Sequence, residues 1–266
     1  MTTATPATPG TVPADQLPRR AWVEQVMGLP VSVHVRGEHA HSTLVEQAVR
    51  QVYRSLREAD ARFSTYRSDS EVSALRRGEG IEPSDDMLEV LALCAQARAR
   101  TGGVFDADLP GGFDPSGLVK GWAVERAAEP LRELAVGNDW LVNAGGDIVL
   151  HAEAGRTWRV GVEDPRDPSR TLSTFSLSHG AIATSGHLRR GDHIIDPRTG
   201  RPAERSVLSA TVLGPSLLWA DVDATAAYVR GEESLGWAGR MPGSTLLLVR
   251  SDGSLVSTRP HRPLPA

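Results

Sequence analysis

Asp221 and Thr225 have side-chain oxygens that can act as ligands, and they lie four residues apart. The spacing of the apolar residues around them predicts a helix over 217–230. Residues at positions i and i+4 share one face of a helix, so the carboxylate and the hydroxyl can converge on one point. Hard oxygen ligands that leave room for water and phosphate suit Mg²⁺. Asp223 is expected to point elsewhere. Taken alone, the spacing favours a solvated acidic helix face over a metal site, and only the other motifs of the chain can reverse that preference.

A basic residue, Lys120, stands within the segment Asp-Pro-Ser-Gly-Leu-Val-Lys-Gly at 114–121. This segment predicts a helix start, with Ser116 as N-cap and with Gly117 and Gly121 allowing close backbone approach. One turn into the helix, Lys120 can hold a phosphate beside the positive helix end. The segment is not a P-loop, because a glycine follows the lysine where Ser or Thr is required. A helix start with an exposed lysine would have the same pattern.

A third candidate is His193, which begins the stretch His-Ile-Ile-Asp-Pro-Arg-Thr-Gly. Imidazole titrates near neutral pH and suits a general base. Upstream, Thr184, Ser185 and Gly186 offer hydroxyls and a backbone that can contact phosphate. However, Asp-Pro-x-x-Gly is in the first place a turn signal, and a single histidine is usually structural.

The composition limits the classes of protein to which the chain can belong. Its 266 residues carry a net charge of −4, with 40% hydrophobic and 23% charged residues, which is ordinary for a globular protein. Nucleic acid is not expected as a partner, because phosphate binding normally leaves a basic balance. A single cysteine, Cys94, excludes an intramolecular disulfide and a zinc site made only of cysteines.

No segment resembles a membrane span or an export signal. The longest charge-free run, 206–220, contains a Gly-Pro pair and is shorter than the roughly 20 apolar residues that cross a bilayer. The N-terminal stretch is rich in Thr, Ala and Pro, without a basic start or an apolar run. We therefore expect a cytoplasmic protein without a membrane span, in which residues 1–20 form a flexible tail and residues 21–260 one domain.

Apolar periodicity places most helices in the first half of the chain and most strands in the second. The first helix should begin with a capping box of Thr43 and Glu46, and the third should bend at Pro130. The stretch 143–147 is interpreted as a tight turn in which Asp147 bonds the backbone. Helices segregated from strands predict an α+β fold, a single domain with mixed or antiparallel sheets and packed helices. Expected helices span 42–62, 84–99, 116–131 and 217–230, and expected strands span 31–35, 140–142, 148–150, 158–162, 172–177, 181–184, 207–213, 246–249 and 255–257.

Several short motifs, by their residues and by their order along the chain, together resemble those of the ApbE family of flavin transferases, also called FAD:protein FMN transferases. The resemblance extends over roughly residues 23–257. The motifs that carry it lie at 27–33, 63–71, 103–106, 114–121, 141–147, 183–186, 193–200 and 220–226.

The resemblance implies an enzyme that binds FAD and Mg²⁺ and transfers FMN through a phosphoester bond to a Thr or Ser hydroxyl of a target flavoprotein, with release of AMP. It implies that Asp221, Thr225 and the backbone carbonyl of Gly117 ligate Mg²⁺. It further implies that Lys120 faces the phosphates and that His193 takes the proton from the acceptor hydroxyl. The residues implied to bind the flavin nucleotide are Met27, Tyr66, Val104, Phe105, Asp106, Gly117, Lys120, Thr184, Ser185, Gly186, His193 and Ile194.

Two other activities fit the same site: an FAD pyrophosphatase that yields AMP and FMN, and a flavin-binding protein without turnover. The chain also departs from the family pattern in two places. Only residues 107–113 separate the Phe-Asp motif from the Lys-Gly motif, where the family usually carries a few dozen residues. Arg76 stands where the family usually has an asparagine.

Overall fold

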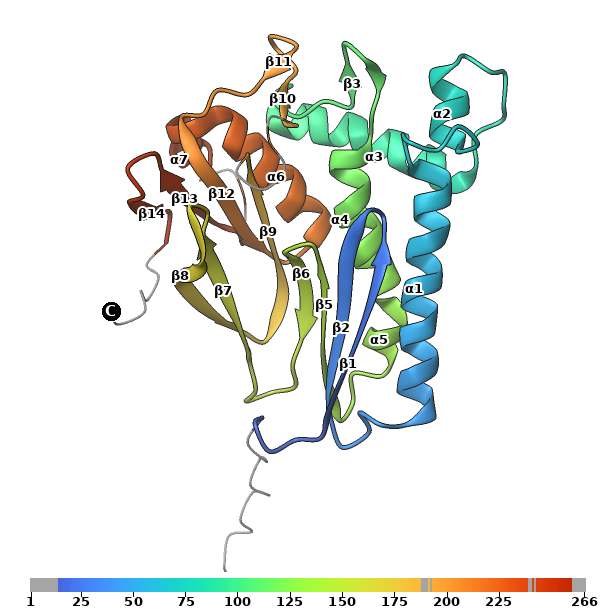
Figure 1. Cartoon of the computed structure of the whole chain (residues 1–266), viewed down its shortest axis with the longest axis vertical. Helices are drawn as coiled ribbons and strands as arrows, with labels where there is room; N and C mark the ends of the chain where they lie inside the picture. Colours follow the sequence, from blue (N-terminus) through green and yellow to red (C-terminus); the bar gives the residue numbers. More distant parts are fainter. Residues whose placement is uncertain (1–13, 188–190, 192, 239–240, 242, 260–266) are drawn as a thin grey trace, which may run out of the picture.

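The centre of the fold is an eight-stranded sheet (Figure 1). The computed structural model describes residues 14–187, 191, 193–238, 241 and 243–259. Every pair of neighbouring strands in this sheet is antiparallel. The expectation of an α+β fold is therefore confirmed. The spatial order of the strands is β1 (Arg19–Val26), β2 (Leu29–Gly37), β5 (Asn138–Ala144), β6 (Asp147–His151), β9 (His179–Gly186), β12 (Val207–Gly214), β13 (Thr245–Arg250) and β14 (Leu255–Ser257).

Helices cover one face of this sheet, and their apolar sides form the larger core together with Val33 and Val142. The longer helices are α1 (Thr43–Phe63), α3 (Asp85–Thr101), α4 (Ser116–Ala127) and α6 (Leu217–Arg230). The short ones are α2 (Glu71–Arg76), α5 (Glu129–Glu133), α7 (Ser234–Trp237) and a 3₁₀ turn at Gly231–Glu233.

The other face of the sheet carries a hairpin of β7 (Trp158–Asp164) and β8 (Asp167–Leu177), which packs in a second apolar cluster with Leu141 and Ile182. Successive strand residues point to opposite faces, which is why Leu141 joins this cluster while its neighbour Val142 joins the larger core. Two smaller hairpins complete the fold: β3 (Asp108–Leu109) with β4 (Gly112–Phe113), and β10 (Ile195–Asp196) with β11 (Arg201–Pro202).

Several local predictions at chain turns were wrong. Helix α1 is capped by Ser42, whose side chain accepts a hydrogen bond from the Val45 N–H, and not by Thr43. Ser116 is the first residue of α4 and not its N-cap, a position that Pro115 occupies without a side-chain hydrogen bond; the Ser116 N–H is instead bonded by the Asp114 carboxylate. At Pro130 the helix does not bend but stops and restarts, since proline is favoured only in a first turn. Strand β1 begins inside the expected tail, at Arg19.

The two departures from the family pattern lie together in this structure. Residues 107–113 form the β3–β4 hairpin, and Arg76 at the end of α2 donates a hydrogen bond to the backbone oxygen of Gly111 at the hairpin tip, 2.8 Å away. Arg76 therefore supports the short segment that replaces a longer one.

Candidate active site

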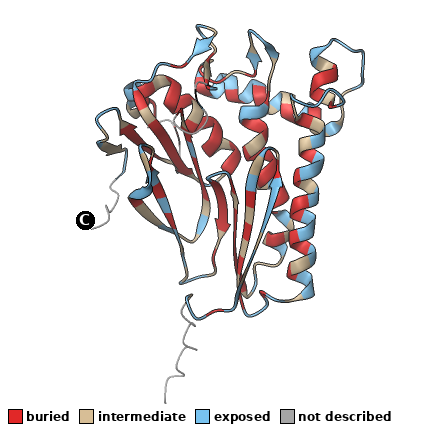
Figure 2. Ribbon diagram, viewed as in Figure 1, coloured by how far each residue is buried: buried red, intermediate tan, exposed pale blue. Residues whose placement is uncertain are grey.

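Helices α4 and α6 touch at a glycine, and this contact brings the candidate residues together. A Cβ at Gly121 would lie 2.9 Å from the backbone oxygen of Leu217 and 3.1 Å from the Cβ of Asp221. Distances this short require a residue without a side chain, so Gly121 allows the two helix backbones to approach. Lys120 is thereby placed beside Asp221. Buried residues are concentrated where these helices meet the sheet (Figure 2).

We expect Gly121→Ala to destabilise the fold by about 2 kcal/mol, because the added methyl group meets backbone atoms that must shift. The shift should also separate Lys120 from Asp221 and weaken Mg²⁺ binding. Thermal denaturation and calorimetric Mg²⁺ titration measure the two effects. Gly236→Ala in α7 is the matched control, since a Cβ there meets nothing within 4 Å. Equal behaviour of the two variants would contradict the role given to Gly121.

Three charged side chains from three elements meet beside this contact. The Lys120 ammonium forms an ion pair with the Asp147 carboxylate and lies 3.3 Å from Oδ1 of Asp221. Both carboxylates are buried, and the second oxygen of Asp147 accepts a hydrogen bond from the Thr184 N–H at 3.0 Å. Two buried carboxyl groups thus share one ammonium group, and ionisation of both would leave the cluster with an excess negative charge.

The second carboxylate oxygen of Asp221 is buried and has no hydrogen-bond partner among the described residues. Burial raises the pKa of Asp221 well above its ordinary value; the Lys120 charge opposes the shift, and the Asp147 charge adds to it. A buried carboxylate oxygen without a partner is unfavourable unless a cation or donor reaches it. The oxygen therefore marks a place where a cation fits.

One helical turn further along α6, the Thr225 hydroxyl lies 3.0 Å from the Ser185 hydroxyl at the end of β9. This contact holds Thr225 on the same side of α6 as Asp221. Asp223, between them, points away, as the sequence predicted, and it receives two hydrogen bonds from the Arg100 guanidinium, at 3.0 and 2.7 Å. A site made of one carboxylate, one hydroxyl and backbone carbonyls suits Mg²⁺, which keeps several water or phosphate ligands. No cluster of three His, Cys, Asp or Glu side chains that can hold a metal occurs in the described part of the chain.

These residues line a cavity of about 540 Å³, and every site residue predicted from the sequence contributes to its wall. Gly117 faces the cavity at the start of α4, and the Phe105 ring packs against it, 3.3 Å from where a Cβ would lie. The predicted residues in the wall are Met27, Tyr66, Val104, Phe105, Asp106, Gly117, Lys120, Thr184, Ser185, Gly186, His193, Ile194, Asp221 and Thr225.

His193 is exposed at this cavity. Its Nδ1 lies 3.1 Å from the backbone oxygen of Gly191. A carbonyl oxygen only accepts, so Nδ1 carries the proton in this contact and Nε2 is the basic nitrogen of the neutral ring. The tautomer therefore suits proton removal by Nε2.

Asp147 is the residue that sequence reasoning missed. The turn at 143–147 was predicted, and the carboxylate does bond a backbone N–H, but that group belongs to Thr184 on a different strand. Its ion pair with Lys120 was not expected. The signal that the sequence offered was the position of Asp147 directly after two glycines, within the motif at 141–147 that the chain shares with the ApbE family.

Met27 adopts a backbone conformation that is unusual for its residue type, with φ of 56°. It forms a two-residue hairpin turn with Gly28, whose φ is 69°, between the paired residues Val26 and Leu29. Such turns need positive φ at both positions, which favours Gly or Asn rather than Met. Because strain of this kind concentrates at binding sites, the Met27 side chain in the cavity wall is a candidate ligand contact.

We expect Met27→Gly to leave the free energy of unfolding within about 1 kcal/mol of the parent, since relief of strain offsets the lost packing. The affinity for FAD, the ligand that the resemblance implies, should fall about tenfold, as expected for the loss of one apolar contact. Fluorescence titration and thermal denaturation measure both. Unchanged affinity for FAD would show that the side chain does not contact the ligand.

No helix in the described residues has the length and apolar character needed to span a bilayer.

Comparisons with known proteins agree with the motif pattern. The model of the ApbE family matches residues 27–111 and 110–248. A Vibrio cholerae protein named FAD:protein FMN transferase is 36% identical over 167 residues, which cover 57% of this chain and 49% of that protein. A Haemophilus influenzae protein of the same name is 24% identical over 302 residues, which cover 88% of this chain and 87% of that protein. The chain thus aligns with about half the length of the first relative.

Solved structures show the same fold. The ApbE protein from Thermotoga maritima superposes with a TM-score of 0.80 at 21% identity, covering 90% of this chain and 96% of that one. The flavin transferase ApbE from Vibrio cholerae gives 0.77 at 25% identity, covering 91% and 96%. Because the family model spans most of the sequence and the architecture agrees, the chain belongs to the ApbE family.

Proposed function

We propose that this chain is a Mg²⁺-dependent FAD:protein FMN transferase, which attaches FMN through a phosphoester bond to a Thr or Ser of a target flavoprotein and releases AMP. The observation that carries the proposal is the convergence of Lys120, Asp147, Asp221 and Thr225 on one cavity, where an Asp221 oxygen lacks a partner among the described residues. Relatives named FAD:protein FMN transferase support the choice of reaction.

In this proposal Asp221, Thr225 and the backbone oxygen of Gly117 hold Mg²⁺. The donor set fits, because it combines a charged oxygen, a hydroxyl and a carbonyl at the edge of a cavity. When bound, Mg²⁺ neutralises the charge of the diphosphate and polarises its phosphorus–oxygen bonds. Asp147 remains with Lys120 and fixes the position of its ammonium group.

The residues of the chain supply the other steps of the reaction. Lys120 donates hydrogen bonds to phosphate oxygens, and the backbone of residues 184–186 lies along the same edge. His193 accepts the proton of the acceptor hydroxyl at Nε2 while that oxygen attacks the phosphorus of the FMN half. The bond from this phosphorus to the oxygen of the AMP phosphate breaks, and AMP leaves with the bonding electrons. Catalysis of this kind depends on positioning and electrostatics.

The flavin ring is assigned to the apolar part of the cavity wall. Met27, Val104 and Phe105 supply apolar contacts there. Tyr66 is 98% exposed, and its ring gains a partner if it covers the flavin.

Incubation of the protein with FAD and Mg²⁺ tests the proposal, with and without a pooled library of short peptides that carry a central Thr or Ser. We expect AMP release together with fluorescent peptide, and loss of both when EDTA is added. AMP and FMN without labelled peptide would instead indicate a pyrophosphatase. Bound, intact FAD would indicate a binding protein without turnover.

A further inference from the structure

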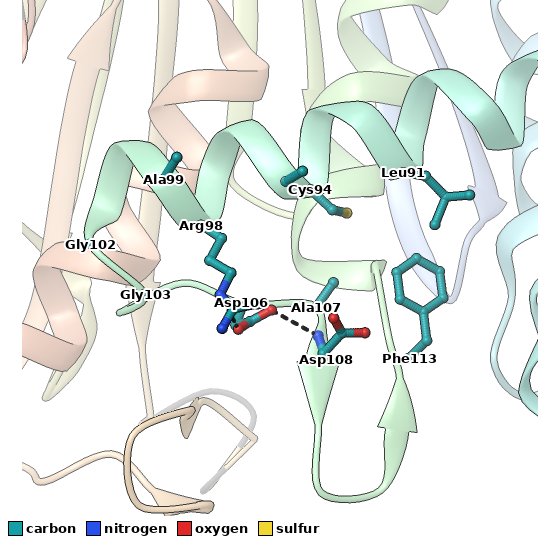
Figure 3. Close-up of a pocket in the computed structure, with 11 residues that line it drawn as sticks. Leu91, Cys94, Arg98, Ala99, Gly102, Gly103, Asp106, Ala107, Asp108 and Phe113 are labelled. Carbon is teal, nitrogen blue, oxygen red and sulfur yellow. Dashed lines mark hydrogen bonds and ion pairs between the residues drawn. The ribbon is translucent and has the colours of Figure 1, made fainter.

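A second cavity, of about 630 Å³, lies between α3 and the β3–β4 hairpin (Figure 3). It forms an open groove beside residues 106–108, and the first of these residues also lines the candidate active site. Its lining consists of Leu91, Cys94, Ala95, Arg98, Ala99, Gly102, Gly103, Asp106, Ala107, Asp108 and Phe113.

One wall of the groove is a continuous apolar face of α3. Leu91, Ala95 and Ala99 follow each other at intervals of four residues, so they share a side of the helix. Cys94 belongs to the same wall, and burial together with the Asp108 and Asp106 charges raises the pKa of its thiol to about 12. The thiol is therefore neutral and acts as an apolar surface. Phe113 faces this wall from β4.

The groove and the active-site cavity meet at Asp106, which lines both. Its carboxylate is fixed by Nε of Arg98 at 3.0 Å and by the N–H of Asp108 at 3.0 Å. The preceding residue, Phe105, packs against Gly117 at the start of α4. The groove therefore leads to the end of the active-site cavity where the metal and phosphate groups are assigned.

The charges of the groove disfavour part of a dinucleotide as its occupant. Among the described residues of the lining, Arg98 is the only cation, and it is paired with Asp106. Asp106 and Asp108 give the floor a net negative charge, which repels phosphates. An apolar wall beside a negative floor fits a partly apolar polypeptide segment without acidic side chains.

We propose that this groove binds the acceptor flavoprotein, by receiving an extended segment whose apolar side chains pack on α3 and whose Thr or Ser passes Asp106 into the active site. The inference depends on the proposed transferase function and adds to it the surface that selects the acceptor. The occupant is a polypeptide because the hydroxyl to be modified must arrive next to Phe105 and Gly117 from outside the FAD cavity.

Filling the groove tests this inference. Ala95→Trp places an indole on its apolar wall, while Gln96→Trp adds the same group to an exposed position of α3 that does not line the groove. The substrate is the one Thr peptide that wild-type protein labels most strongly from the pooled library. Initial rates of labelling are measured at varied peptide and at varied FAD concentration, and circular dichroism checks that both variants are folded.

For Ala95→Trp we expect the KM for the peptide to rise about tenfold and the KM for FAD to stay within about twofold, with Gln96→Trp unchanged. Ala99→Trp, one turn along the same wall, should repeat the result and replaces the first variant if that one does not fold. A raised KM for FAD would overturn the inference, because the groove would then hold part of the dinucleotide. Wild-type kinetics in Ala95→Trp and Ala99→Trp would overturn it as well. Failure of wild-type protein to label any peptide would contradict the transferase proposal itself, and the inference with it.

Discussion

Replacing Asp221 by Asn is expected to lower the rate of FMN transfer about a thousandfold, close to 4 kcal/mol of transition-state stabilisation. The amide has nearly the same shape as the carboxylate, so packing against Gly121 is preserved. It lacks the charge, so Lys120 loses one of its two buried carboxylate partners, and the proposed Mg²⁺ site loses the anionic ligand assigned to it. We expect Mn²⁺ binding, measured by electron paramagnetic resonance, to weaken in parallel.

Asp223→Asn is the matched control for this prediction. Asp223 is buried two residues away on the same helix, but its carboxylate binds Arg100 and does not face the cavity. Removing this charge should lower the free energy of unfolding by about 2 kcal/mol, since a hydrogen-bonded buried ion pair is broken. Mn²⁺ affinity and transfer per folded molecule should stay within about twofold. If Asp221→Asn bound Mn²⁺ as tightly as this control, the metal assignment would be wrong.

His193→Gln is expected to lower transfer by about two to three orders of magnitude at neutral pH, the usual contribution of a general base. Glutamine retains a hydrogen-bonding side chain but cannot accept a proton from a hydroxyl. Because His193 is exposed at the cavity and lies in the loop before β10 rather than on α6 with Asp221, FAD and Mn²⁺ affinity should change by no more than about twofold. Single-turnover labelling of the selected peptide, with FAD and Mn²⁺ titrations alongside, measures the separation of chemistry from binding.

The control for the histidine is His179→Gln. His179 is exposed at the start of β9, its ring nitrogen is hydrogen-bonded to the neighbouring Ser178 hydroxyl, and it does not line the cavity. This variant should transfer FMN at the parent rate. Full transfer by His193→Gln together with weak FAD binding would instead make His193 a binding residue and would remove the base from the mechanism.

Local sequence patterns were sufficient for the fold class and for most elements. The alternation of Val31, Val33 and Val35 predicted a strand because side chains along a strand point to opposite faces, and these three are buried in the larger core. Likewise, the four-residue spacing of Asp221 and Thr225 was enough to place both on one side of α6. Such patterns depend on backbone geometry within one element, so the sequence contains all the information that they require.

Local reasoning failed where the outcome depended on neighbouring groups. Ser42 rather than Thr43 caps α1. Both side chains are able to cap a helix, so the sequence alone does not decide at which of the two adjacent residues the helix begins. Strand β1 was overlooked because its residues are mostly exposed and include two adjacent arginines, so its apolar alternation is weak. It is a strand because β2 pairs with it through the tight turn at Met27 and Gly28.

By itself, the sequence determined which residues can do chemistry and which elements carry them. Only the tertiary structure decided that Lys120 pairs with Asp147 and stands beside Asp221, because these residues belong to α4, β6 and α6, which meet through the close contact at Gly121. It also decided that one oxygen of Asp221 lacks a partner among the described residues while Asp223 is satisfied by Arg100. The choice of a charge partner depends on distance and burial across elements, and no periodicity within one element encodes either quantity.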